Sequence, residues 1–358
     1  MAPPSHLTER ERRALLAEPA GRVRVVFDTD AANEIDDQYT LAWALLSQDV
    51  LSIEGMYATP FAWDHMREGM IEAYDLRRRN EPLPPHLHRY RGRIEGLVAQ
   101  GRDPRHETFI TPEEGMERSY DEIALVHEKM GMTPVGLRRG STRYMRDVDD
   151  AVDSPAARHL IERALADGDG PLYVVAIGAL TNVASALVLE PAIRDRIVVT
   201  WTAAYPSFAP LPNASFNLEP DVPATRVVFE CGVPLVYLPG YHVGAQLPMS
   251  LADVEKHVRG RGAIGDYLHH LYLNNPVQAR RGITDLEGRT WVMWDMINVA
   301  WLLDPTWVPS HVVPTPTLDD DLRWRPQPNA PEMREGIGVE RDRIFRDFYR
   351  KLEAHGRT

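Results

Sequence analysis

Acidic residues crowd into one short stretch near the start of the chain, FDTDAANEIDDQ (27–38). Its ten central positions hold Asp28, Asp30, Glu34, Asp36 and Asp37, and the stretch contains no Lys or Arg. One or two carboxylates suit a helix N-terminus, but a larger group repels itself unless a cation is bound. An all-oxygen ligand set favours Ca²⁺ ahead of Mg²⁺ if backbone carbonyls contribute. The stretch therefore predicts a cation site, although a solvent-exposed, capped helix start is the plainer alternative.

The acidic stretch must be positioned by the elements around it. Predicted strands, rich in Val, Ile and Leu, are 23–27, 51–58, 171–178, 196–203 and 234–240, and predicted helices are 35–47, 156–166, 182–189 and 295–303. Continuous apolar strands that alternate with helices indicate an α/β fold, with a mostly parallel central sheet and helices on both faces. The active crevice of such a sheet lies beyond the carboxyl ends of its strands, where the acidic stretch stands.

The chain of 358 residues is interpreted as one large domain over 23–358, preceded by a polar lead-in over 1–22. The stretch 80–140 is less regular and could be an insertion that covers the site, or a surface excursion. The Pro- and Asp-rich tail 314–331 is predicted to be irregular, and a final helix is expected from about 341 to 355.

Composition narrows the partners and the compartment. The formal net charge of -12 argues against nucleic acid as a partner, because phosphate backbones are bound by clustered Lys and Arg. No apolar run approaches the roughly 18 residues that span a bilayer, so no membrane partner is expected. The N-terminus lacks the apolar core of a signal peptide, and the single cysteine, Cys231, allows no internal disulfide. A cytoplasmic location is therefore predicted.

Four segments, in order along the chain, resemble motifs of the inosine/uridine-type nucleoside hydrolases. DTDAANEIDD (28–37) keeps the DxD and the terminal DD of the family's DxDPGxDD, with two extra residues between them. AIGALTNVASALVLEP (176–191) resembles TGPLTNIAxAxxxxP, and ASFNLEPD (214–221) resembles AEFNxxxDP. WDMINVAWLLDP (294–305) resembles HDPxAVAxxLxP. Together they identify the chain as a divergent member of this family, which implies a nucleoside-hydrolase-like (Rossmann-like) architecture.

The resemblance implies calcium-dependent hydrolysis of the N-glycosidic bond of a ribonucleoside or related N-riboside, a small-molecule substrate. It also implies a homo-oligomer, a dimer or a tetramer. The implied calcium ligands are Asp30, Asp37, the main-chain carbonyl of Ile177, and Asp295. Asp30 would also be the general base that takes a proton from water, supported by Asp28 behind it. Asp36 and Asn217 would hold sugar hydroxyls, and Ser215 would do so less tightly than the Glu of the family.

Singly, these residues have simpler interpretations. Asp295 could cap the following helix, Asn217 could be a turn residue, and Thr181 is most simply a helix N-cap. The order of the four segments along the chain favours the site.

The chain departs from the family where the leaving base needs a proton. Trp294 stands at the position of the family's His and has no proton to give, although it can stack on a base. His242, which follows strand 234–240, is predicted as the replacement acid, and His65 is a second candidate. Further aromatic residues that could reach the base are Trp63, Trp201, Tyr205 and Phe208. Ordinary core or lid packing is the alternative role for each aromatic side chain.

Two other functions fit parts of the sequence. DTD after a first strand also resembles the haloacid-dehalogenase phosphatases, with Asp28 as nucleophile, Asp30 as acid, and Mg²⁺. Asp319, Asp320 and Asp321 could complete such a site, but the pair Asp36–Asp37 has no role in it. A third hypothesis is a non-catalytic protein that binds nucleoside or ribose. Trp294 and Ser215, which replace catalytic positions of the family, keep that hypothesis open.

Overall fold

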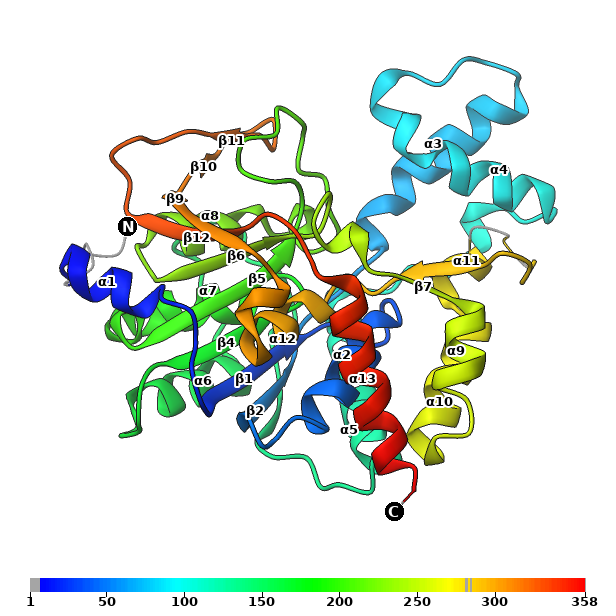
Figure 1. Ribbon diagram of the computed structural model, residues 1–358. Coiled ribbons are helices and arrows are strands. Elements are labelled where there is room, and N and C mark those ends of the chain that lie inside the picture. Colours follow the sequence, from blue (N-terminus) through cyan, green and yellow to red (C-terminus); the bar gives the residue numbers. More distant parts are fainter. Residues whose placement is uncertain (1–6, 281–282, 284, 358) are drawn as a thin grey trace.

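An eight-stranded sheet runs through the computed structural model, which describes residues 7–280, 283 and 285–357 (Figure 1). The strand order is β3-β2-β1-β4-β5-β6-β12-β9, and all neighbours pair in parallel except β12 with β9. In that order the strands are Leu137–Arg139, Leu51–Ala58, Val23–Thr29, Leu172–Ala176, Ile197–Ala203, Leu235–Pro239, Glu332–Gly336 and Ser310–Pro314. The predicted mostly parallel sheet is confirmed.

Helices cover both faces of this sheet because successive strand side chains point in opposite directions (Figure 1). In β1, Val25 and Phe27 join one apolar core and Val26 joins the other. The first core includes α2 (Asp36–Leu45), α5 (Pro112–Lys129), α9 (Leu251–His257), α10 (Gly262–Leu273), α12 (Met296–Leu303) and α13 (Arg341–His355). The second includes α6 (Pro155–Leu165), α7 (Thr181–Leu189) and α8 (Val222–Glu230).

A third apolar cluster belongs to a helical excursion, α3 (Arg67–Arg78) and α4 (Arg91–Ala99), which stands away from the sheet in Figure 1. The stretch 80–140, considered above as an insertion, contains α4 but also α5 and β3. Helix α5 contributes Ile123 and Val126 to the main core, and β3 pairs with β2. The excursion that packs by itself therefore begins before residue 80 and ends before α5.

Short elements complete the chain. They are α1 (Glu9–Leu15), α11 (Pro276–Arg280), and two antiparallel pairs: β7 (Pro248–Ser250) with β8 (Thr290–Val292), and β10 (Thr317–Leu318) with β11 (Trp324–Arg325). Helix α1 lies inside the predicted polar lead-in. Within the described ranges, no helix combines the length and the apolar character needed to cross a bilayer.

Candidate active site

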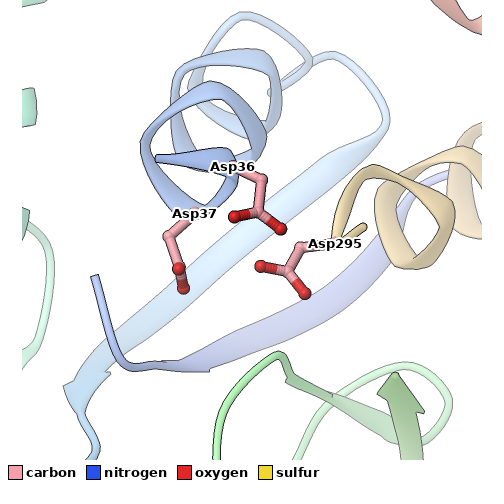
Figure 2. Close-up of side chains that lie close together, drawn as sticks. All are labelled: Asp36, Asp37 and Asp295. Carbon is pink, nitrogen blue, oxygen red and sulfur yellow. The ribbon is translucent and has the colours of Figure 1, made fainter. Parts of the chain in front are cut away.

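Three carboxylates from distant parts of the chain meet at the edge of the sheet. Asp36 and Asp37 open α2, and Asp295 immediately precedes α12. One oxygen of each lies within 4.8 Å of the others, and Figure 2 shows the three side chains turned toward one another. All three are buried, and Oδ1 of Asp36 has no hydrogen-bond partner. Converging carboxylate oxygens with an unused acceptor are what a bound cation requires.

The link between β1 and α2 brings Asp30 beside this group. The backbone N–H of Asn33 donates to the carbonyl of Asp30 at 3.0 Å, and its side-chain amide donates to Oδ2 of Asp30 at 2.9 Å. Ala32, between them, has a left-handed φ of 77°. At the other end of the link, the Thr29 hydroxyl donates to Oδ1 of Asp37 at 2.5 Å. The two extra residues are thus accommodated by a tight, hydrogen-bonded turn.

Burial is the largest cause of the pKa shifts in this group. It raises the pKa of Asp37 to about 7, opposed by the hydrogen bond from Thr29. Burial and then the charge of Asp37 raise the pKa of Asp30 well above its usual range. Burial and then the charge of Asp36 do the same for the pKa of Asp295. Such mutual repulsion in a buried site is relieved by a divalent cation, so the donor set fits Ca²⁺.

A cavity of about 380 Å³ opens onto the carboxylates. Its wall includes every residue that the sequence assigned to metal or substrate: Asp30, Asp36, Asp37, Ile177, Ser215, Asn217, Trp294 and Asp295. They come from the ends of β1 and β4, the starts of α2 and α12, and the loop after β5. The carboxyl ends of neighbouring parallel strands thus meet here, as the sheet type predicts.

Polar side chains in the cavity differ in how they are held. The amide of Asn217 donates to the carbonyls of Ile177 at 3.1 Å and Thr202 at 3.0 Å, which fixes the 214–221 segment against β4 and β5. Ser215 is 6% exposed and its hydroxyl has no hydrogen-bond partner. A buried hydroxyl without a partner costs free energy, so Ser215 suits a ligand that supplies one.

The structure places His242 outside the cavity lining. Its side chain is exposed, its backbone has a left-handed φ of 73°, and its ring meets the ring of Tyr205 edge-on at 5.4 Å. His65 is also exposed and absent from the lining. Trp201 is fully buried and donates its indole hydrogen to the carbonyl of Gly178, so it packs in the core. Trp63, Tyr205 and Phe208 do not line the cavity either.

Asp28 lies behind the cavity wall and not in it. It is fully buried, and its two oxygens accept from Asn182 at 2.8 Å and Thr59 at 3.3 Å. Thr181, predicted as a helix cap, instead donates its hydroxyl to Asp221 at 2.6 Å, and Leu180 is the N-cap of α7. The LTN segment therefore anchors the sheet edge that carries the site.

The second aspartate run is elsewhere in the fold. Asp319 pairs with Arg325 at 2.6 Å, Asp320 pairs with Arg226 at 2.6 Å, and neither lines the cavity. Since Asp28 is enclosed by hydrogen bonds and this run is remote, the phosphatase hypothesis loses both its nucleophile and its extra carboxylates.

Several lining residues were missed from the sequence. They are Asn33, Glu34, Thr202, Ala203, Ala204, Phe216, Gly240, Tyr241, Thr290, Trp291 and Val292. Phe216 lies between the predicted site residues Ser215 and Asn217, and Tyr241 follows the end of a predicted strand. Both positions could therefore have been predicted from the sequence to lie near the site. The β8 residues had none, because only the pairing of β7 with β8 brings them over the site.

Comparisons with known proteins agree with this geometry. Residues 25–344 match the family described as inosine-uridine preferring nucleoside hydrolase. The pyrimidine-specific ribonucleoside hydrolase RihB of Escherichia coli O1:K1 / APEC is 38% identical over 90 residues, which span 25% of this chain but only 28% of that relative. RihB of Escherichia fergusonii matches to the same extent.

Among solved structures, a purine-preferring ribonucleoside hydrolase from Gardnerella vaginalis has a TM-score of 0.64 at 16% identity, covering 93% of this chain and 99% of the other. An inosine-uridine preferring nucleoside hydrolase from Bacillus anthracis has a TM-score of 0.55 at 16% identity, covering 92% and 99%. At such identities these two structures support the fold alone. Because the family match covers most of this chain, the chain belongs to the inosine-uridine preferring nucleoside hydrolase family.

Proposed function

We propose that the protein hydrolyses the N-glycosidic bond of a ribonucleoside or a related N-riboside and uses Ca²⁺ as its cofactor. One observation carries the proposal: a single cavity of about 380 Å³ is lined by a buried carboxylate group, by polar side chains and by aromatic rings. A nucleoside needs all three, for catalysis, for its sugar hydroxyls and for its base. Family membership supports the reaction class, and so do the names of the relatives, which include pyrimidine-specific and purine-preferring ribonucleoside hydrolases.

The calcium ligands in this proposal are Asp30, Asp37, Asp295 and the carbonyl of Ile177. Asp37 and Asp295 belong to the group of carboxylates whose oxygens lie within 4.8 Å of one another; the third member of that group is Asp36, a further candidate ligand, and Asp30 is not in it. When bound, the cation offsets the mutual repulsion of the carboxylates and lowers the pKa of water beside them.

The remaining steps belong to the side chains of the protein. Asp30, which lines the cavity, accepts the proton of the attacking water through its carboxylate. The other carboxylates favour the positive charge that develops on the sugar as the bond breaks. The amide oxygen of Asn217, the hydroxyl of Ser215 and the carboxylate of Asp36 hold the sugar hydroxyls, and the indole of Trp294 packs against the base.

A reducing-sugar assay tests the proposal directly. The purified protein is incubated with inosine, guanosine, uridine and cytidine, with EGTA or with added Ca²⁺. Ribose release that EGTA abolishes and Ca²⁺ restores is expected. Asp30→Asn should lower kcat at least about 100-fold while the circular dichroism spectrum is kept. Activity that is unchanged in EGTA, or a near-normal rate for Asp30→Asn, contradicts the proposed roles.

The binding-protein hypothesis predicts a different result from the same panel. Tight binding of ribose or a nucleoside without release of reducing sugar would establish it, and Trp294 and Ser215 are the observations in its favour. We further propose that the protein is a cytoplasmic homo-oligomer, a dimer or a tetramer, as the family resemblance implies. Light scattering after gel filtration tests the subunit number, and a monomer mass at micromolar concentration would contradict it.

A further inference from the structure

The described lining of the cavity has no histidine to protonate a leaving base, and the proposed function uses its clustered carboxylates as ionised calcium ligands. Among the described residues that line it, there is no Lys, Arg or His, and five are acidic: Asp30, Glu34, Asp36, Asp37 and Asp295. Four more are aromatic: Phe216, Tyr241, Trp291 and Trp294. Tyr241 has the one phenol in this set, and its hydroxyl donates to the backbone carbonyl of Ala214 at 3.5 Å. The wall is therefore acidic and aromatic, with no cationic side chain in its described part.

Such a wall discriminates between two kinds of N-riboside. A neutral purine or pyrimidine leaves as an anion unless it is protonated, and an anion is repelled by the acidic wall. A base that already carries a positive charge leaves as a neutral heterocycle and needs no donor. Aromatic faces and carboxylates both attract such a cation. The proposed Ca²⁺ ligands are Asp30, Asp37 and Asp295, so the carboxyl groups of Glu34 and Asp36 still line the cavity as additional acidic groups when the ion is bound.

We propose that the site is selective for N-ribosides whose base is cationic, such as pyridinium or N7-alkylpurinium ribosides, an inference that rests on the proposed function. Trp294, Trp291 and Glu34 are then its specificity-determining residues. Glu34 belongs to the link between β1 and α2, outside the group of ligand-spaced carboxylates, and its side chain still reaches the cavity. Of the five acidic side chains in the lining, it is the one to which the proposed function gives no other role.

The bond changes balance without an external donor. The electron pair of the C1′–N bond moves to the ring nitrogen and cancels the positive charge of the base. The oxygen of water forms the new bond to C1′. One proton of that water passes to Asp30 and then to solvent, so the products are ribose, a neutral base and one proton.

Two matched hydrolysis pairs give the first test, with the full chain and Ca²⁺. We compare 7-methylguanosine with guanosine, and 1-ribosylnicotinamide with uridine, by reducing-sugar release below pH 7. The cationic member of each pair should have at least about a 100-fold higher kcat/KM, the scale of one missing general acid. Tyr241→Phe and His242→Ala should leave this ratio unchanged, whereas a ratio that depends on either side chain identifies it as a donor and overturns the inference.

Because cationic ribosides are also more reactive in water, a binding measurement separates recognition from reactivity. The probes are 1-methylnicotinamide, a cation, and 3-methylbenzamide, its neutral isostere, titrated by tryptophan fluorescence or calorimetry. The cation should bind at least about tenfold more tightly. Trp294→Leu and Glu34→Gln should each reduce that preference at least about threefold, whereas the exposed control Glu128→Gln should not.

The outcomes distinguish this inference from the function on which it rests. Efficient hydrolysis of guanosine and uridine, with equal binding of the two probes, overturns the inference and leaves the proposed function intact. No sugar release from any riboside overturns the proposed function, and the probe titrations then still decide whether the cavity prefers a cationic ring.

Discussion

The carboxylates of Asp36, Asp37 and Asp295 lower the stability of the folded protein but form the proposed binding site. Each carboxylate is buried beside others of the same charge, an arrangement that destabilises the folded protein when no cation is present. Burial raises the pKa of Asp37 to about 7, and burial followed by neighbouring charge raises the pKa values of Asp36 and Asp295 well above their usual range. Buried like charges that destabilise the folded protein are typical of a site that binds a ligand.

The pH dependence follows from the sign of these shifts. A carboxyl whose folded pKa exceeds its unfolded value of about 4 contributes its full stability below pH 4 and loses it as pH rises through the folded value. In EGTA, the protein should therefore lose stability from pH 5 to pH 8 as Asp37 and its neighbours ionise. Ca²⁺ should oppose this loss, so the increase in Tm on adding Ca²⁺ should grow over the same range. Differential scanning calorimetry measures it, and an increment that is constant with pH would contradict the shared site.

Replacing one carboxylate should separate stability from function. Asp295→Asn removes a repelling charge, so in EGTA at pH 8 the free energy of unfolding should rise by about 1 kcal/mol or more. In Ca²⁺ the same variant should be less stable than the parent protein and should lose activity. Asp320→Asn, whose parent side chain is 97% exposed, is the matched control and should change neither quantity. A variant destabilised equally in both buffers would indicate a purely structural Asp295.

At the scale of elements, the site is held by the loops that follow parallel strands. Asn182, in the first turn of α7, donates to Asp28 at the end of β1 and accepts from the backbone and hydroxyl of Ser141. These bonds join α7, β1 and the loop after β3 behind the cavity. A buried amide with this many partners fixes the relative position of the elements.

Removing the Asn182 amide should destabilise the packing of α7 against the carboxyl-terminal end of β1. Asn182→Ala leaves Oδ1 of Asp28 and the Ser141 N–H without these partners, so the protein should lose about 2 kcal/mol or more of unfolding free energy. Urea denaturation measures the loss, with the exposed Gln100→Ala as control. A change within experimental error would show that water replaces the amide without cost.

Replacing His242, in the loop after β6, tests whether its side chain acts as a proton donor, because the backbone at this position favours glycine whereas a proton donor requires the imidazole. Its φ of 73° is strained for any residue but glycine. His242→Gly should therefore raise the free energy of unfolding by about 1 kcal/mol and leave ribose release unchanged. If the sequence-based assignment of a proton donor is correct, the variant should instead lose activity.

Much of this arrangement could be predicted from the sequence because the informative residues are apolar runs or local clusters. The strands at 23–27, 51–58, 171–178, 196–203 and 234–240 were predicted because their side chains are buried on both faces. β3, β9 and β12 were not predicted because their sequences are short or polar; β3 and β9 are the edge strands, and β12 lies between β6 and β9. The acidic wall was predicted from the contiguous stretch 27–38 and from the separate segment that contains Asp295. Among the aromatic residues of the wall, Trp294 was predicted, but Trp291 was not, because it reaches the site only through the pairing of β7 with β8.

At the scale of the whole molecule, the cavity joins the first tenth of the chain to its last quarter. Two of the clustered carboxylates stand at the start of α2 and the third precedes α12, and these helices pack side by side in the first apolar core (Figure 1). Anything bound among them acts as a cross-link between distant segments and should stabilise the folded state by mass action.

Hydrogen exchange can detect that cross-link. Ca²⁺ should slow amide exchange in the first turns of both α2 and α12, while the exchange of α3, in its separate cluster, should not change. Protection confined to α2 would mean that Asp295 takes no part in binding.

The distance in sequence between Asp37 and Asp295 also matters during synthesis. A ribosome that has completed the first four-fifths of the chain has released every acidic residue of the β1–α2 link but not the carboxylate that faces them. A nascent chain that stops before Asp295 therefore lacks the assembled group, and the three carboxylates cannot meet until α12 has docked beside α2.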